Sequence, residues 1–158
     1  MNDNPSLDAL LAEEQELQFP SFSADVAWTL GSHIYQRAKA GSLPIAIEVS
    51  RNSQQLFFAA LPGATPDNAD WIRRKRAVVH RFHHSSLYMS VEAEVKGRPF
   101  LQRYGLSEQD YAAAGGGFPI FVKETGCVGA VVVSGLPQLD DHRLVTEAIR
   151  ETIARLAA

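Results

Sequence analysis

The chain has 158 residues, which suits one domain with a substantial hydrophobic core. Its 46% hydrophobic and 21% charged residues are typical of soluble globular proteins, and a net charge of −3 gives no basic field to attract nucleic acid. Its one cysteine, Cys127, excludes an intramolecular disulfide and a zinc site built from cysteines. The acidic residues 1–18 lack the apolar core of a signal peptide, and no apolar run could span a bilayer. We expect one domain, residues 1–158, in the cytoplasm, with neither a membrane nor a nucleic-acid partner.

The first part of the sequence predicts a helix, an edge strand, a second helix and a β-hairpin. Pro20 limits its segment to a short edge strand, because proline cannot donate to a β-ladder. Ser23 suits the N-cap of the second helix, and Gly41 suits its end. In the first hairpin strand apolar residues alternate, the second strand is a mostly apolar run, and a polar turn separates the two. The expected spans are 6–16 and 24–40 for the helices, 16–22 for the edge strand, and 44–50 with 55–61 for the hairpin.

The second part predicts a long helix, a short helix, a second hairpin and a final helix. Thr65 followed by Pro66 begins the long helix, which runs to about His84 and then either continues or kinks toward residue 94. Ser107 is expected to cap a short helix that ends in a glycine loop. Two hairpins require an antiparallel sheet, which the separated helices must cover, so the fold class is α+β. The expected spans are 118–123 with 127–134 for the hairpin and 138–156 for the final helix.

Three of the five histidines, His80, His83 and His84, lie within one short stretch of the long helix. A helical wheel places them opposite the apolar stripe, among Arg73 and Arg76. His80 and His84 have the spacing of helical zinc ligands, but the glutamate of the H-E-x-x-H motif is missing and the arginines oppose a dication. The alternatives are a solvated or subunit-facing surface, which we favour, an anion-binding rim, and a metal site.

Lys75 lies on the apolar stripe of the same helix, with Ser85 and Ser86 beside the stripe. The stripe is defined by Trp71, Val78 and Phe82, and Arg81 flanks it. A lysine in this position either extends its ammonium to solvent or directs it into a pocket. In the second alternative, the lysine and the two serines would form a polar cluster suited to a carboxylate or a phosphate.

The glycine run Gly115 to Gly117 is a second candidate for binding an anion. Successive backbone amides can hold an anion, whereas the alternative is a flexible turn into the next strand. The run matches neither dinucleotide-binding nor P-loop spacing. Asp141 is expected to interact with the dipole of the last helix, and its neighbour His142 is too close in sequence to share its face. Cys127 fits a core position better than a nucleophile.

The second half of the sequence resembles a known family. The segment "AAGGGFPIFVKETGCVGAVVVSGLPQLDDHRLVTEAI", residues 113–149, is similar to the glycine loop, terminal hairpin and final helix of the HbpS/GlcG-like superfamily, often labelled the haem-degrading domain. The segments "WIRRKRAVVHRFHHSS" and "SGLPQLDDHRLVTEAI" resemble its branch of uncharacterised cytosolic proteins from bacteria and fungi.

The resemblance implies a profilin-like fold, with an antiparallel sheet of about five strands flanked by helices. It also implies a homo-oligomer, with dimers assembled into a larger particle, and a cleft near the glycine loop. Relatives include haem-binding proteins, so haem is a candidate cofactor, although no residue can be matched to an axial ligand.

Three functions follow as hypotheses. The first is an oligomeric protein that binds a small anionic ligand, either a tetrapyrrole such as haem or an organic acid. The second is an assembly module without a ligand, in which acidic Asp8, Glu13, Glu14 and Glu16 meet basic Arg73, Arg76 and His80 across subunits. The third is an enzyme acting on haem or a small acid, for which no catalytic constellation is recognisable. The predicted ligand-binding residues are Lys75, Arg81, Phe82, Ser85, Ser86, Gly115, Gly116, Gly117, Pro119 and His142.

Overall fold

The structure is a computed structural model that describes residues 3–158; Met1 and Asn2, which begin the acidic amino-terminal segment, lie outside the described residues. Its elements are α1 (Leu7–Glu16), β1 (Gln18–Phe19), α2 (Ala24–Ala40), β2 (Ala46–Arg51), β3 (Gln54–Ala60), α3 (Pro66–Phe82), α4 (Ser86–Lys96), α5 (Phe100–Tyr104), β4 (Gly117–Val122), β5 (Gly126–Ser134) and α6 (Gln138–Leu156). No helix within residues 3–158 is long and apolar enough to cross a membrane.

The strands form one five-stranded sheet in the order β1-β4-β5-β2-β3. The two predicted hairpins, β2–β3 and β4–β5, are antiparallel, and β5 pairs antiparallel with β2 to join them. β1 pairs parallel with β4, so the sheet is mixed rather than wholly antiparallel. The predicted α+β fold with about five strands is confirmed, and the parallel pair is the one departure from the expected pairing.

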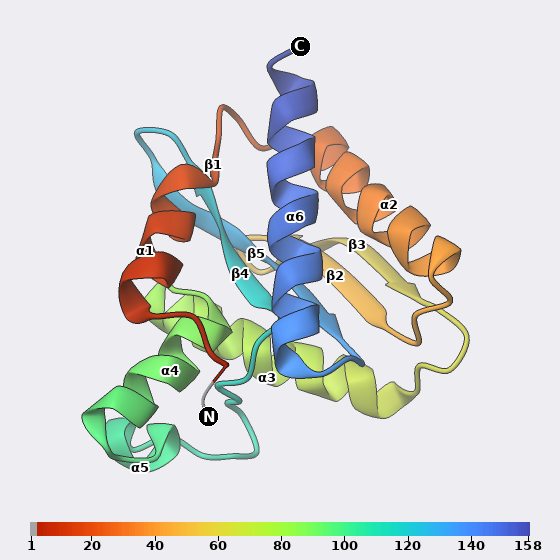
Figure 1. Cartoon of the computed structure of the whole chain (residues 1–158). Coiled ribbons are helices and arrows are strands. Elements are labelled where there is room, and N and C mark those ends of the chain that lie inside the picture. Colours follow the sequence, from red (N-terminus) through yellow and green to blue (C-terminus); the bar gives the residue numbers. More distant parts are fainter. Residues whose placement is uncertain (1–2) are drawn as a thin grey trace.

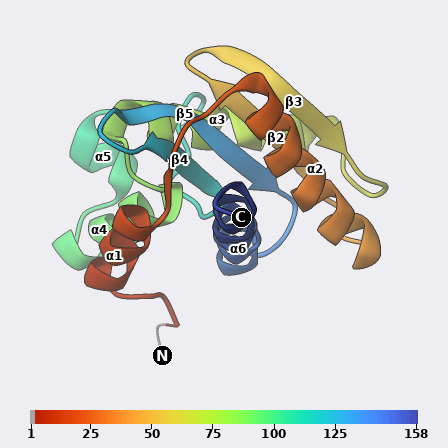
Figure 2. The same ribbon diagram turned by 90° about the horizontal axis from the view of Figure 1, so that it is seen from above.

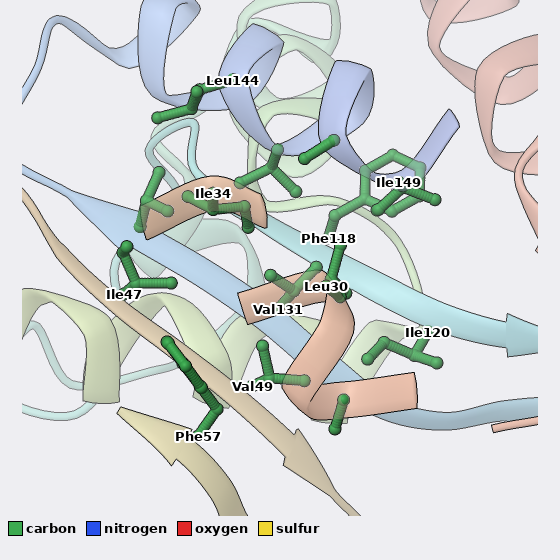
Figure 3. Packing of buried hydrophobic residues seen from close by; sticks show 14 of the residues in the cluster. Leu30, Ile34, Ile47, Val49, Phe57, Phe118, Ile120, Val131, Leu144 and Ile149 are labelled. Carbon is green, nitrogen blue, oxygen red and sulfur yellow. The ribbon is translucent and has the colours of Figure 1, made fainter. Parts of the chain in front are cut away.

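Helices cover both faces of the sheet (Figures 1 and 2). α2 and α6 lie on one face, α3 lies on the other, and α1 packs beside α4 near the β1 edge. The main core fills the space between the sheet and the α2–α6 layer, as Figure 3 shows for Leu30, Phe118 and Ile149. Gly31 permits α2 to approach β3 closely, because a Cβ at that position would lie 2.4 Å from the ring of Phe57.

Two predicted helix boundaries change in the structure. The long helix ends at Phe82, because His83 adopts a left-handed conformation with φ of 56°, and Ser85 then caps α4 through the backbone N–H of Tyr88. The predicted helix capped by Ser107 is wrong. Residues 108–110 form a turn in which the Ser107 hydroxyl accepts a hydrogen bond from the Gln109 N–H. The short helix of this region is α5, which precedes the turn.

Candidate functional site

Lys75 directs its ammonium into the protein, as one of the two sequence alternatives proposed. It lies on the face of α3 that packs against the sheet, and its side chain is buried. Its Nζ donates one hydrogen bond to the Val133 carbonyl, at 3.1 Å, and one to Oδ2 of Asp141, at 3.3 Å. The anion that meets the lysine is therefore a carboxylate of the same chain.

Asp141 holds the other half of this buried ion pair from the first turn of α6. Its Oδ1 accepts a hydrogen bond from the Leu136 N–H at 3.1 Å, so the connection between β5 and α6 fixes the carboxylate. Burial raises the pKa of Asp141 to about 6, although the Lys75 charge acts in the opposite direction. Burial also lowers the pKa of Lys75. A buried lysine and carboxylate with shifted pKa values are a common feature of functional sites.

The glycine loop allows the lysine head to pack closely against the backbone. Gly116 has φ of 133°, and a Cβ there would lie 2.8 Å from Lys75 Nζ and 2.5 Å from the Val133 carbonyl oxygen. The Gly115 N–H donates to Oε1 of Gln138, at 3.0 Å, and the Gly117 N–H donates to the Ser86 hydroxyl, at 2.9 Å. These two amides are already used inside the protein, so the loop makes room for the lysine rather than presenting a free anion cradle.

A cavity of about 290 Å³ lies beside the Lys75–Asp141 pair. The amino-terminal half of α3 supplies Asn68 and Trp71, the glycine loop supplies Gly115, and the end of β5 supplies Ser134. An ammonium group carries three N–H donors, and two of those on Lys75 have partners within the described residues. The cavity therefore combines one remaining ammonium donor with the carboxyl groups of Asp67 and Asp141, neutral polar groups and an indole wall. We call it the Lys75–Asp141 cavity.

The structure brings together only part of the predicted site. Lys75 and Gly115 line the cavity, while Gly116 and Gly117 pack behind the lysine. Ser86 is buried and supports the loop through both polar groups of Gly117.

The other predicted residues lie elsewhere. Arg81 is exposed, and Phe82 packs against the aromatic rings of α5. Ser85 caps α4, Pro119 is buried in β4, and Nε2 of His142 pairs with Oε1 of Glu13 on α1, at 2.6 Å. None of these five side chains lines the Lys75–Asp141 cavity.

Sequence reasoning missed Asp141 and Trp71 as site residues. The sequence indicates only a helix-dipole interaction for Asp141 and a place on the apolar stripe for Trp71. The usable signal is the segment "SGLPQLDDHRLVTEAI", which carries the family resemblance and contains Asp141.

The three clustered histidines separate in the structure. His80 and His83 line another cavity, of about 300 Å³, together with Cys127, whereas His84 pairs with Glu14 through its Nδ1 at 2.8 Å. Burial is the main cause that lowers the pKa of His80, and the Arg76 charge adds to it. Within the described chain, no group of three or more His, Cys, Asp or Glu residues is placed to hold a metal ion.

The acidic side chains of α1 are engaged within the subunit. Glu13 pairs with His142, Glu14 with His84, and Glu16 with Arg150. On the basic side, Arg73 pairs with Asp70 and Arg76 with Glu48. Each of these five side chains already has a partner in its own chain, and the contact of the acidic and basic residues across subunits stays a prediction.

A family model described as "Haem degrading protein HbpS-like" matches residues 22–150. The chain belongs to the HbpS-like family. Among curated relatives of this HbpS-like protein, a UPF0303 protein of Edwardsiella ictaluri is 48% identical over 149 residues, covering 94% of this chain and 95% of the relative. A UPF0303 protein of Rhizobium rhizogenes is 46% identical over 147 residues, covering 93% and 90%. The sequence resemblance is confirmed.

Solved structures agree on the fold of the HbpS-like protein. The crystal structure of Ybr137w has a TM-score of 0.88 at 26% identity and covers 95% of this chain and 89% of its own. HbpS itself has a TM-score of 0.63 at 17% identity, covering 88% and 92%. A haem complex of PduOC has a TM-score of 0.69 at 15% identity, covering 82% and 94%. At these lower identities the likeness concerns the fold alone.

Proposed function

We propose that the protein binds a small organic acid in the Lys75–Asp141 cavity. The observation that supports the proposal is a buried lysine with one ammonium hydrogen left for an oxygen acceptor, at the wall of a cavity of about 290 Å³. Ligand pockets commonly measure ~300–1,000 Å³, so this volume favours a small molecule. A charge-assisted hydrogen bond from a desolvated ammonium is among the stronger polar contacts available to a carboxylate.

The partner carboxylate makes this binding depend on pH. While Asp141 is ionised, it neutralises Lys75 and repels a second carboxylate, and the carboxylate of Asp67 in the same cavity wall adds to this repulsion. Because burial raises the pKa of Asp141 to about 6, mildly acidic conditions protonate it and leave the lysine charge for the ligand. Affinity for a small acid should therefore increase as the pH falls from 8 to 5.5.

Haem, which the family description implies, does not fit this cavity. A haem iron is held in proteins by side chains such as His, Cys, Met or Tyr. None of the described residues that line the Lys75–Asp141 cavity is of these types. His80 lies at a different cavity, and its Nε2 is buried without a hydrogen-bond partner.

A thermal-shift series with acetate, propionate and glyoxylate at pH 5.5 and 8 tests the proposal. A bound acid should raise the melting temperature with concentration, because it stabilises the folded state by RT ln(1 + [L]/Kd). The variant Lys75→Met/Asp141→Asn removes both charges and should abolish the response. Arg81→Met removes an exposed cation from the same helix and should respond like the wild type. No shift with any acid, or an unchanged response in the double variant, would contradict the proposal.

We also infer that the protein forms a homo-oligomer, with dimers assembling into a larger particle. Supporting this, β3 is an outer strand of the sheet, Trp28 packs against Phe57 of β3 yet is 63% exposed, and Phe58 is 43% exposed. Exposed aromatic side chains at an unpaired strand edge are typical of association surfaces. Light scattering should show a multiple of the 17.3 kDa chain mass that decreases in Trp28→Ser/Phe58→Ser, and a wild-type monomer would refute the inference.

A further inference from the structure

A larger and more apolar cavity adjoins the Lys75–Asp141 cavity. Its volume is about 560 Å³, and both cavities include Trp71 and Ala114 in their walls. The remaining wall comes largely from α5 and the segment before the glycine loop, including Phe100, Leu101 and Tyr111. We call it the Tyr111 cavity.

Trp71 is held firmly where the two cavities meet. The guanidinium carbon of Arg74 lies 4.0 Å from the centroid of the Trp71 ring, a cation–π contact. Arg74 is itself fixed, since its Nε donates to Oδ2 of Asp70 at 3.1 Å, and its backbone carbonyl accepts the Ala112 N–H at 3.2 Å. The indole is therefore a preorganised wall, which reduces the entropy lost when a ligand packs against it.

The chemistry of the wall changes from one cavity to the other. Lys75, Asp141 and Asp67 provide charge on one side of Trp71. Most of the wall on the other side is apolar or aromatic and includes Phe100, Leu101 and Tyr111, although Arg74 and Glu108 also line it. Aromatic walls favour flat rings through stacked and edge contacts. A molecule that satisfies both sides has an acid group at one end and an aromatic ring at the other.

We propose that the ligand is an aryl-substituted carboxylic acid, with its acid group at Lys75 and its ring beyond Trp71 in the Tyr111 cavity. This inference rests on the proposed function, because the lysine anchors the acid group. It adds a ligand class, an orientation, and a role for Tyr111 that differs from that of Lys75.

Calorimetric titration at pH 5.5 with propionate and 3-phenylpropionate tests the inference. Burial of the phenyl ring should make 3-phenylpropionate bind roughly 10- to 100-fold more tightly than propionate. Tyr111→Ala should remove most of this gain and leave propionate binding within about twofold, since Tyr111 lines only the apolar cavity of the two. Leu101→Ala is a second variant of the same wall, and Trp28→Phe is the control at a remote aromatic residue.

The Trp28→Phe protein also provides a direct spectroscopic reporter. The chain has two tryptophans, so this variant leaves Trp71 as the sole one. Its fluorescence should shift when 3-phenylpropionate binds, and the midpoint should agree with calorimetry.

The outcomes separate the two proposals. Equal affinity of the wild type for both acids would overturn the aryl-acid inference and leave organic-acid binding intact. If 3-phenylpropionate binds equally well to Lys75→Met/Asp141→Asn, the proposed function fails, and the inferred orientation fails with it. If neither acid binds to the wild type, both proposals are refuted.

Discussion

Two sets of ion pairs stabilise this molecule, and their surroundings differ sharply. The Lys75–Asp141 pair lies between α3 and α6, and the Asp141 side chain is 1% exposed. The pairs that hold α1, which we call the α1 pairs, join Glu13 to His142, Glu14 to His84 and Glu16 to Arg150. In the first two pairs one partner is buried, whereas both partners of the third are exposed, and the Glu16 side chain is 57% exposed.

The depth of burial decides whether desolvation or pairing is the larger cause of each pKa shift. In the buried pair, loss of solvation outweighs mutual attraction, so the pKa of Asp141 rises and that of Lys75 falls. In the α1 pairs, the hydrogen bond is the largest cause: Glu14 raises the pKa of His84, and Arg150 lowers that of Glu16. Burial therefore disfavours the charged forms of the buried pair, whereas the α1 pairs favour the charged forms and stabilise the docking of α1.

Breaking the Lys75–Asp141 pair should have the largest effect on the free energy of unfolding. Lys75→Met leaves Asp141 as an uncompensated buried charge, and such changes typically cost ~3–5 kcal/mol. Urea unfolding at pH 7 measures the loss. The double variant Lys75→Met/Asp141→Asn should recover most of it, because the asparagine amide is neutral and its Oδ1 can still accept the Leu136 N–H. A cost no greater than that of Arg81→Met would contradict the importance of this pair.

The second-largest effect should be the pH dependence of stability that the buried Asp141 causes. Its pKa rises from 3.8 in the unfolded chain to about 6 in the folded protein. Between pH 4 and 6, the folded state binds a proton that the unfolded chain has released, so the free energy of unfolding decreases as the pH rises, by up to about 3 kcal/mol. The free energy of unfolding of the wild type, minus that of Asp141→Asn, should decrease over the same pH range. A difference that is flat or that increases with pH would show that Asp141 stays ionised.

Local sequence patterns predicted the elements and one half of the buried pair. The helical wheel placed Lys75 on the apolar stripe because the residues that define the stripe lie within the same helix. Its partner, Asp141, lies 66 positions away, and helical periodicity carries no information on such a pairing. The parallel β1–β4 pair escaped prediction for the same reason, since β1 has two residues and its partner is distant in sequence.

The helical wheel gave wrong placements beyond the end of α3. It was extended through Ser85 and Ser86, although His83 breaks the helix and turns the chain. Ser86 still reaches the site, but it does so through the glycine loop rather than along the stripe. Arg81 was assigned to the cleft from its place at the stripe's edge, and at such an edge a long charged side chain reaches solvent more readily than the interior.

Weakening the middle α1 pair should have an intermediate effect. Glu14→Gln removes the charge that faces His84 and weakens the hydrogen bond from the buried Ser85 N–H, at 3.0 Å, for a cost of ~1–3 kcal/mol. Because Glu14 raises the pKa of His84, this contribution is complete below pH 6.5 and decreases as the pH rises through the folded-state value. Urea unfolding of the wild type and of Glu14→Gln at pH 6 and at pH 9 measures the cost and its pH dependence. An equal cost at the two pH values would mean that His84 does not contribute.

The most exposed α1 pair should have the smallest effect and the opposite pH dependence. Glu16→Gln breaks its bond with Arg150, and exposed pairs typically contribute within ~1 kcal/mol. Since Arg150 lowers the pKa of Glu16, the contribution is present above about pH 4.5 and is lost as the pH falls through the folded-state value. It should also decrease in 1 M salt by more than the Lys75–Asp141 effect does, because salt screens exposed charges much more than buried ones. Urea unfolding with and without salt checks this difference, and a cost as large as that of Glu14→Gln would show that exposure does not rank these pairs.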